Sequence, residues 1–273
     1  MQKVSMFIPC LADLFMPEIG EASFQLLRHL DLNPTYHKEQ TCCGQPLFNS
    51  GYIKHAKKSA KHFIEVFRND DAIVCPSGSC VHMVKHRYVE LFGDESAWLN
   101  RAQEIASSIY ELSQFVVDVL RIEGVGASFD GKAAYHVSCQ TLRGLGVSQQ
   151  ARKLMGTVKG AELVDLTRAE ACCGFGGKFA NDYPEISEAL VREKVTHYLE
   201  SGADVLVVSE PGCLLNIGGY LSRNHPEKKV MHIANFLTQG IRNGDTLVGD
   251  TMRHGVPNKG IQIVSLRREH DEG

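Results

Sequence analysis

The chain has 273 residues, of which 43% are hydrophobic and 22% are charged, and its formal net charge is −3. This composition is ordinary for a globular protein, and so small a charge gives no reason to expect binding to nucleic acid or to an anionic membrane. No apolar stretch approaches the ~20 residues needed to cross a bilayer, and the amino terminus resembles a buried strand more than a signal peptide, so we expect a cytoplasmic protein.

Short apolar runs alternate with amphipathic stretches along the chain. The apolar runs, which predict buried strands, are 4–9, 72–75, 133–137 and 205–209. The clearest amphipathic stretches, which predict helices, are 19–30, 54–67 and 186–199. Strands that alternate with helices favour an α/β fold with mostly parallel sheets.

Four cysteine landmarks occur twice in the same order. A single cysteine that ends an apolar run is followed by a Cys-Cys-Gly triplet, and then by a cysteine that follows a second apolar run. The first interval is 32 residues in one half and 33 in the other, and the second is 37 and 40. This agreement indicates a tandem duplication, so we expect two similar α/β lobes related by a pseudo-two-fold axis.

The duplication defines the expected domain boundaries. The first cysteine-rich repeat covers 1–123 and the second covers 132–242, with the glycine-rich stretch 124–131 as the linker. The remaining residues, 243–273, form a C-terminal extension without a counterpart in the first repeat. Within it, the run 260–266 could form an edge strand or contact a partner.

The nine cysteines are odd in number, the chain is not short and we find no export signal, so a disulfide framework is disfavoured and metal binding or redox chemistry is favoured. Single cysteines after strands converge at the carboxyl edge of a parallel sheet. Adjacent cysteines offer two thiolates to one cluster, and Gly44 and Gly174 permit the tight turn that brings backbone N–H groups near sulfur. We therefore expect each repeat to hold a metal cluster, with the ligands Cys10, Cys42, Cys43 and Cys80 in the first and Cys139, Cys172, Cys173 and Cys213 in the second.

Cys75 is the one cysteine without a counterpart, because Val208 occupies the equivalent position. It is either a fifth ligand in the first repeat or a small hydrophobic residue at the end of a strand. We favour the second interpretation.

The doubled pattern resembles the cysteine-rich CCG domain of heterodisulfide reductase and of the iron–sulfur subunits of glycolate oxidase and anaerobic glycerol-3-phosphate dehydrogenase. It is most similar to the lactate-utilisation protein A family, over residues 1 to about 240. The stretches that carry the likeness are Thr41-Cys-Cys-Gly-Gln-Pro-Leu-Phe-Asn-Ser-Gly-Tyr52, Ser77-Gly-Ser-Cys80 and Ala171-Cys-Cys-Gly-Phe-Gly-Gly177.

This resemblance implies an iron–sulfur electron-transfer subunit of an NAD-independent complex that oxidises L-lactate. It also implies one 4Fe–4S cluster in each repeat, and two partners: a ferredoxin-like iron–sulfur subunit and a further small subunit. It does not say whether the oxidation takes place on this chain or on a partner, so no catalytic residue is assigned.

Two alternatives stay open. Four thiolates also suit tetrahedral zinc in a structural scaffold, although structural zinc sites mostly use C-x₂-C spacing and not adjacent cysteines. A thiol–disulfide enzyme would match the heterodisulfide reductase resemblance, but the C-x-x-C ending typical of that reductase is missing here. Four thiolates in each repeat fit a simpler 4Fe–4S site.

Other polar features have more ordinary interpretations. His136 and His82 lie near cysteines and could donate hydrogen bonds to cluster sulfur, but we expect them to be satisfied elsewhere or exposed. The stretch 174–177 lacks a complete nucleotide-binding signature, so we predict a turn beside the cluster and no nucleotide site. The basic helical face at 54–61 is expected to be solvated, or to steer an acidic ferredoxin-like partner.

Overall fold

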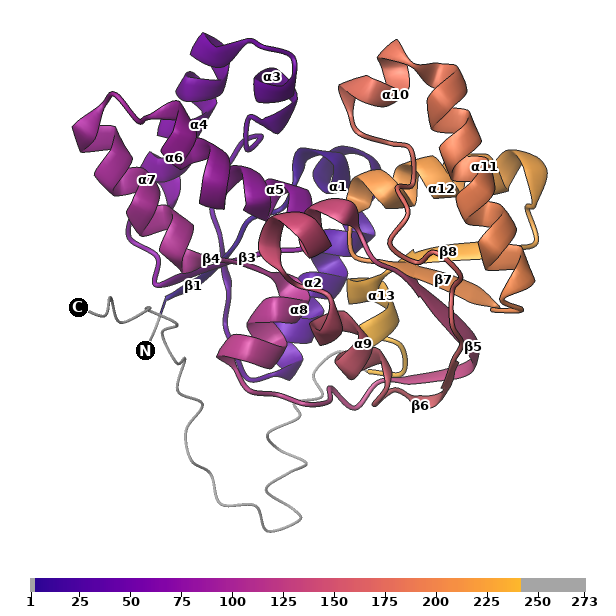
Figure 1. Cartoon of the computed structure of the whole chain (residues 1–273). Helices are drawn as coiled ribbons and strands as arrows, with labels where there is room; N and C mark the ends of the chain where they lie inside the picture. Colours follow the sequence, from indigo (N-terminus) through magenta and orange to yellow (C-terminus); the bar gives the residue numbers. More distant parts are fainter. Residues whose placement is uncertain (1–2, 242–273) are drawn as a thin grey trace, which may run out of the picture.

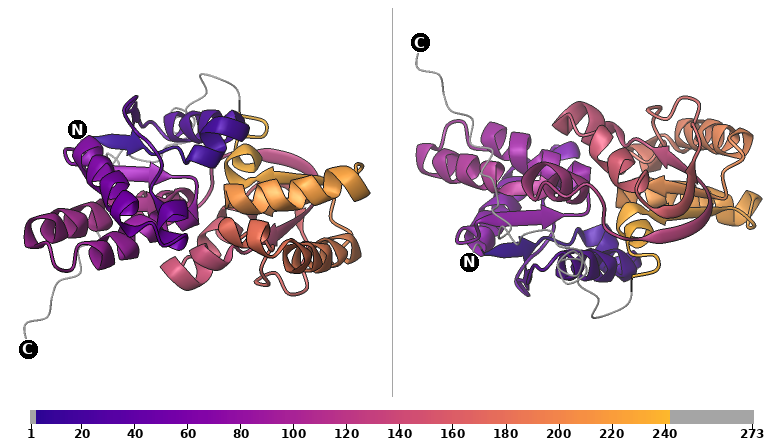
Figure 2. Two further views of the ribbon diagram at one scale, coloured as in Figure 1. Left: turned by 90° about the horizontal axis from the view of Figure 1, so that it is seen from above. Right: turned by 90° about the horizontal axis from the view of Figure 1, so that it is seen from below.

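The structure is a computed structural model that describes residues 3–241. Two α/β lobes lie side by side, each built on a four-stranded parallel sheet (Figures 1 and 2). The expected fold class is therefore confirmed. The C-terminal extension, 243–273, with its apolar run at 260–266, lies outside the described residues.

The two sheets repeat one strand order. In the first lobe the order is β2-β1-β3-β4, with bounds β1 (Val4–Met6), β2 (Thr35–Tyr36), β3 (Ala72–Cys75) and β4 (Ile109–Glu111). In the second lobe it is β6-β5-β7-β8, with bounds β5 (Ser128–His136), β6 (Lys159–Leu163), β7 (Val205–Val208) and β8 (Lys229–His232). Each strand of the first lobe thus has an equivalent in the second.

Helices connect the strands in both lobes. Those of the first lobe are α1 (Cys10–Phe15), α2 (Pro17–His29), α3 (Gln45–Asn49), α4 (Ile53–Phe67), α5 (Gly78–His82), α6 (Tyr88–Leu91), α7 (Ser96–Ser108) and α8 (Leu112–Gln114). Those of the second are α9 (Gln149–Met155), α10 (Lys178–Asp182), α11 (Pro184–Glu200), α12 (Pro211–Asn224) and α13 (Ile233–Leu237). Three π-helical turns complete the set: η1 (Met83–Arg87), η2 (Phe115–Val119) and η3 (Gln140–Gly144). Among the described residues, no helix has the length and apolar character to span a bilayer.

The central strands explain how the sheets are buried. In β3, Ala72 and Val74 face a core shared by both lobes, whereas Ile73 and Cys75 face the outer core of the first lobe. The strand β7 alternates in the same way between the shared core and the outer core of the second lobe. Successive side chains of a strand point to opposite faces, so each sheet has one face against the other lobe and one under its own helices.

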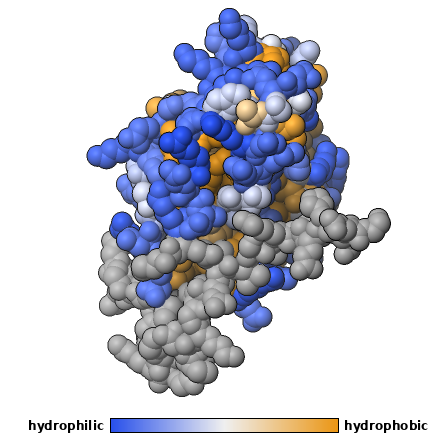
Figure 3. Space-filling view, turned by 90° about the vertical axis from the view of Figure 1, so that its left-hand side faces the viewer, coloured by the Kyte–Doolittle hydropathy of each residue, from blue (hydrophilic) through white to orange (hydrophobic). Residues whose placement is uncertain are grey.

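Helices from both lobes make the shared core. α2 of the first lobe packs against α13 of the second, and α9 of the second lobe packs against α8 and η2 of the first. The outer faces are covered separately, by α4, α6 and α7 in the first lobe and by α11 and α12 in the second (Figure 1). On the outside of the first lobe, the surface is mostly hydrophilic (Figure 3).

A close approach of α5 in the first lobe and η3 in the second joins the lobes. Gly78 on α5 faces Thr141 on η3, and a Cβ on the glycine would overlap the threonine side chain. The absence of a side chain at Gly78 is therefore what allows the two segments to touch.

The structure differs from our expectations at the sheet edges and at the linker. The four edge strands, β2, β4, β6 and β8, were not predicted. The strands β2 and β6 are mostly exposed, and β4 and β8 span only three and four residues, so all four carry little hydrophobic pattern. The strand β5 begins at Ser128, inside the stretch expected to be a linker. The start of this strand pairs with β6 through a register shift between Ser128 and Gly131.

Candidate metal centre

The first quartet of cysteines comes from three loops at the carboxyl edge of the first sheet. Cys10 begins α1 just after β1, Cys42 and Cys43 precede α3, and Cys80 lies in α5 just after β3. The Sγ atoms of Cys10 and Cys42 are 3.6 Å apart, and those of Cys43 and Cys80 are 3.4 Å apart. All four side chains that we expected as ligands in this repeat are thus brought together.

The second quartet repeats this arrangement. Cys139 lies at the start of η3, Cys172 and Cys173 precede α10, and Cys213 lies in the first turn of α12. The Sγ atoms of Cys173 and Cys213 are 2.9 Å apart, and the Cys139 thiol donates a hydrogen bond to Cys172. None of the nine cysteines forms a disulfide.

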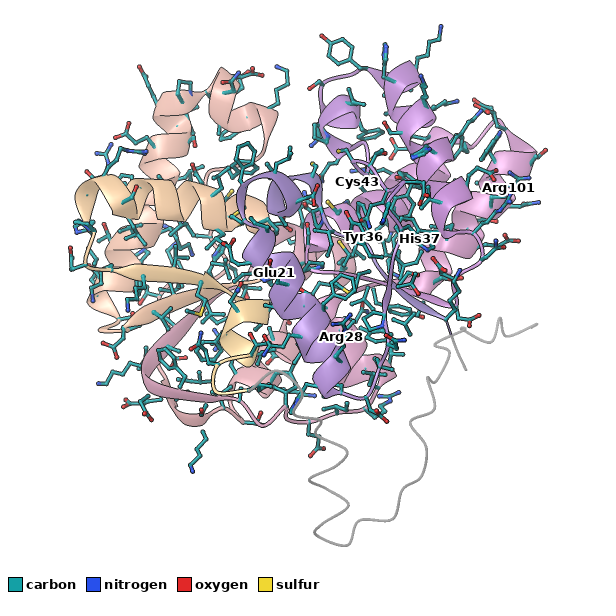
Figure 4. The ribbon with its side chains drawn as sticks, turned by 180° about the vertical axis from the view of Figure 1, so that it is seen from behind. Glu21, Arg28, Tyr36, His37, Cys43 and Arg101 are labelled. Carbon is teal, nitrogen blue, oxygen red and sulfur yellow. The ribbon has the colours of Figure 1, made fainter. Side chains whose placement is uncertain are left out.

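Both quartets line one cavity of about 360 Å³ between the lobes. Its wall includes all eight cysteines, together with polar side chains that include Gln45, Asn49, Gln140, Lys178 and Glu210. Cys43, labelled in Figure 4, lies at the inner edge of the first lobe on the side of the second. The sequence predicted two separate sites, and the packing of the lobes places them around a common space.

The loops that carry the paired cysteines depend on a glycine. Gly44 and Gly174 have φ values of +84° and +86°, a conformation that residues with a Cβ rarely adopt. The Gly44 amide donates to Cys42 Sγ at 3.4 Å, and the Gly174 amide donates to Cys172 Sγ at 3.3 Å. The expected approach of backbone N–H groups to sulfur is therefore present in both loops.

Two thiols in each quartet are disposed to ionise. The pKa values of Cys42, Cys80, Cys172 and Cys213 are all lowered, because neighbouring thiols donate hydrogen bonds to these sulfurs. For Cys213 the hydrogen bond from Cys173 lowers the pKa to about 6. The donors have raised pKa values in turn. Metal ligation requires thiolate, so each quartet already holds sulfurs near the form that binds metal.

The donor set fits an iron–sulfur cluster. Four convergent thiols with amide N–H groups on sulfur are the usual protein environment of such a cluster. The same four thiols also suit zinc. In the second lobe, the ligand atoms of His136, Cys173 and Cys213 lie within 4.8 Å of one another, so His136 extends the possible donor set there.

Cys75 lies apart from the cavity wall. It is fully buried in the outer core of the first lobe, and its Sγ donates to Ser77 O at 3.7 Å. Its thiol also contributes to the lowered pKa of Cys80. This position supports packing under the site, and our prediction that Cys75 is not a ligand stays for mutation to test.

The histidines near the cysteines differ from each other. His136 is buried and its Nε2 lies 3.4 Å from Cys213 Sγ, so it reaches the site directly. His82 instead packs beside His86, with ring centroids 5.0 Å apart, and does not line the cavity. His136 is satisfied, as we expected, by the contact of Nδ1 with Ala169 O at 3.1 Å, but its position at the end of β5 also aims the ring at the sulfur.

Glu210 is a buried carboxylate that we did not single out from the sequence. It precedes α12 in the second lobe, and it accepts hydrogen bonds from the first lobe: from the Ser77 hydroxyl at 3.0 Å and from the Ser79 amide at 2.9 Å. Burial raises the pKa of Glu210 to about 8, with a further contribution from the Cys80 and Cys213 thiolates. This contact ties the helix that carries Cys80 to the helix that carries Cys213.

Two surface features are also defined by the structure. On the basic face at 54–61, Lys57 and Lys61 bind Glu95 at 2.8 and 2.7 Å, so part of that charge is paired. The stretch 174–177 forms a tight turn before α10, and Gly176 and Gly177 line the cavity.

Comparison with known proteins places these motifs in a family. The model of the CCG cysteine-rich domain matches residues 4–85 and again 133–218. The chain is 47% identical over 244 residues to lactate utilization protein A of Exiguobacterium sp., covering 89% of this chain and 99% of that protein. It is 48% identical to lactate utilization protein A of Geobacillus sp., covering 86% of this chain and 98% of the relative.

Among solved structures, a hypothetical protein from Helicobacter pylori is similar with a TM-score of 0.59 at 12% identity. The likeness covers 94% of this chain and 52% of that one, so our chain spans about half the length of that protein. At this identity the similarity supports the fold alone.

The Gly174 turn gives a first prediction. In Gly174→Ala, the new Cβ would overlap Ser187 O of α11, and the positive φ alone costs about 1 kcal/mol or more. We expect a lower Tm and loss of the metal bound by the second quartet, measured by thermal unfolding and metal analysis. Gly202→Ala is the matched control, because its φ of +68° is also positive, the added Cβ has open space and the residue does not line the cavity. Equal Tm and metal content in the two variants would contradict the conclusion that the Gly174 turn shapes the second quartet.

The Glu210 contact gives a second prediction. Its folded pKa of about 8 lies above the ordinary value of 4.5, so the folded protein holds a proton that the unfolded chain loses between about pH 5 and 8. The free energy of unfolding of the wild type should therefore fall with rising pH in this range, by at most about 1.4 kcal/mol per pH unit.

Glu210→Gln should remove this fall, because the amide does not ionise. Urea unfolding of both proteins at several pH values, at equal metal content, measures the difference. Glu188→Gln, at an exposed position on α11, is the control. Parallel curves for wild type and Glu210→Gln would rule out a buried, protonated Glu210.

Proposed function

The chain belongs to the lactate utilization protein A family of CCG cysteine-rich proteins, and on this premise we propose that it is the iron–sulfur electron-transfer subunit of a complex that oxidises L-lactate without NAD. Each repeat, 1–123 and 132–242, holds one 4Fe–4S cluster. The partners are a ferredoxin-like iron–sulfur subunit and a further small subunit, and the complex is cytoplasmic.

The observation that carries this proposal is the convergence of two equivalent thiol quartets on one cavity. A mononuclear structural site would need only one quartet and no open space beside it. Two clusters on the wall of one cavity would be close to each other, and this short separation suits the transfer of electrons between them. The cavity also gives a partner access to both sites.

When a cluster is bound, the cysteines serve as its ligands and the neighbouring amides donate hydrogen bonds to it. A 4Fe–4S cluster supplies one-electron transfer. The ligands are Cys10, Cys42, Cys43 and Cys80 in the first site and Cys139, Cys172, Cys173 and Cys213 in the second. The amides of Gly44 and Gly174 donate to sulfur and so stabilise the added negative charge. The buried walls of both lobes limit the access of water.

Metal analysis of protein purified without oxygen tests the cluster assignment. We expect about eight irons and eight acid-labile sulfides per chain. Cys80→Ser and Cys213→Ser should each lose about half of the iron, because each removes a ligand from one site only. Cys75→Ser is the matched control and should keep both clusters, since this side chain is buried outside the cavity.

Two results would contradict the assignment. Stoichiometric zinc without sulfide, persisting after iron–sulfur reconstitution, would leave a zinc scaffold. Iron loss in Cys75→Ser equal to that in Cys80→Ser would instead make Cys75 a ligand.

The lactate assignment has its own test. L-lactate added to the reconstituted complex without NAD should bleach the visible absorption of the clusters in this chain. Persistent colour, in protein whose clusters dithionite does bleach, would contradict the lactate assignment and leave the cluster assignment intact.

A further inference from the structure

The tandem repeat allows the surroundings of the two sites to be compared position by position. Beside the first quartet lie Phe7 and Phe63, which are buried and pack edge to face with ring centroids 4.8 Å apart. Phe7 is three residues before Cys10, as His136 is three residues before Cys139. A buried polar residue therefore stands in the second lobe where the first has an aromatic ring.

The partner of Phe63 also has a polar equivalent. The buried positions of α4 and α11 follow the same spacing, so that the series Ala56, Ala60, Phe63, Ile64 and Phe67 corresponds to Ser187, Val191, Lys194, Val195 and Tyr198. Lys194 thus occupies the place of Phe63, and it is only 1% exposed. The aromatic pair of the first lobe is replaced by a histidine and a lysine.

The contacts of this polar pair fix its orientation. His136 Nδ1 lies 3.1 Å from Ala169 O, and a carbonyl only accepts, so this nitrogen carries a proton. The other ring nitrogen, Nε2, lies 3.4 Å from Cys213 Sγ and, in this tautomer, has no proton to donate to the sulfur. Lys194 Nζ donates to Arg168 O at 2.6 Å and to Ala169 O at 3.1 Å.

Lys194 brings a positive charge to the second quartet. No carboxylate pairs with it among residues 3–241. Burial lowers its pKa to about 8, while the thiolates of Cys173 and Cys213 oppose this shift. At neutral pH the ammonium form therefore predominates, and it interacts electrostatically with the sulfurs of Cys173 and Cys213 as well as with Glu193.

Within the described part of the chain, no buried ammonium group acts on the thiols of the first quartet. The buried lysine of the first lobe, Lys85, donates to Ala106 O and stacks over Tyr110, and only burial shifts its pKa. Other contacts occur in both sites and do not distinguish them. Tyr88 donates to Cys43 O and Asn216 donates to Cys173 O, both at 2.8 Å.

Positive charge and hydrogen bonds near the sulfurs raise the reduction potential of an iron–sulfur cluster, because the reduced form carries one more negative charge. We propose that Lys194 makes the second site the more readily reduced of the two, so that an electron entering the protein comes to reside there. The inference rests on the proposed function, since it assumes a cluster in each quartet. In this transfer the first site is oxidised by one electron and the second is reduced by one, and no bond or proton is exchanged.

A redox titration with dithionite, followed by electron paramagnetic resonance, tests this proposal. Signals are assigned with Cys80→Ser and Cys213→Ser, each of which retains one cluster. In the wild type, the second site should be reduced first. In Lys194→Met, the ratio of reduced to oxidised second site at a fixed potential should fall at least tenfold, which is about 59 mV for a one-electron couple, with the first site unchanged.

Further variants separate the effect of charge from a general disturbance. Lys194→Arg keeps the charge and should retain the wild-type order of reduction. Lys228→Met is the matched control, because this lysine also donates to a carbonyl, Ala203 O, but at the opposite end of the sheet.

The possible failures are distinguishable. Two clusters with equal potentials in the wild type, or a shift in Lys228→Met as large as that in Lys194→Met, would overturn this inference and leave the proposed function in place. Protein that holds no iron in either site would overturn both. Iron and sulfide are measured for every variant, so a change in potential is compared only between proteins with the same clusters.

Discussion

The arrangement of this protein depends on one constraint: two parallel sheets are packed so that their carboxyl edges open on the same cavity. In a parallel sheet, the loops that follow the strands meet at this edge. Each repeat places one cysteine after its first strand, a pair in a glycine turn and one after its third strand. The shared core of α2, α9 and α13 then holds the two edges toward each other. The eight thiols converge because the lobes cannot separate without exposing that core.

The contact between the lobes reaches the metal sites themselves. Glu210 of the second lobe binds Ser77 and Ser79 of the first, and Ser77 also caps the helix that carries Cys80. Burying a carboxyl group that makes several hydrogen bonds destabilises the fold less than burying an unpaired one. The cost rises again if any of those hydrogen-bond partners is lost. The two sites are therefore joined by a direct contact between the lobes, whereas the charged groups that surround them differ. The two repeats have equal ligand sets, but His136 and Lys194 stand where the first lobe has Phe7 and Phe63, so the surroundings of the two sites are unequal.

Much of this could be predicted from the sequence, for a physical reason. The strands β3 and β7 are short, fully apolar runs, and the repeated cysteine spacing marks the ligands directly. What the sequence did not reveal depends on contacts between distant segments. Glu210 lies 131 residues from Ser79, to which it binds, and no local pattern distinguishes it from a surface glutamate. Lys194 sits on an amphipathic helix where a lysine normally faces solvent, and only the packing of α11 shows that it is buried. The shared cavity, likewise, follows from how the lobes pack.

The most direct test of this account is the electron paramagnetic resonance spectrum of the fully reduced wild-type protein. Two paramagnetic clusters that line one cavity of about 360 Å³ lie close enough for their spins to interact. The account predicts a split or broadened spectrum that collapses to a simple signal in Cys80→Ser. A wild-type spectrum equal to the sum of the Cys80→Ser and Cys213→Ser spectra would contradict two clusters at a shared centre.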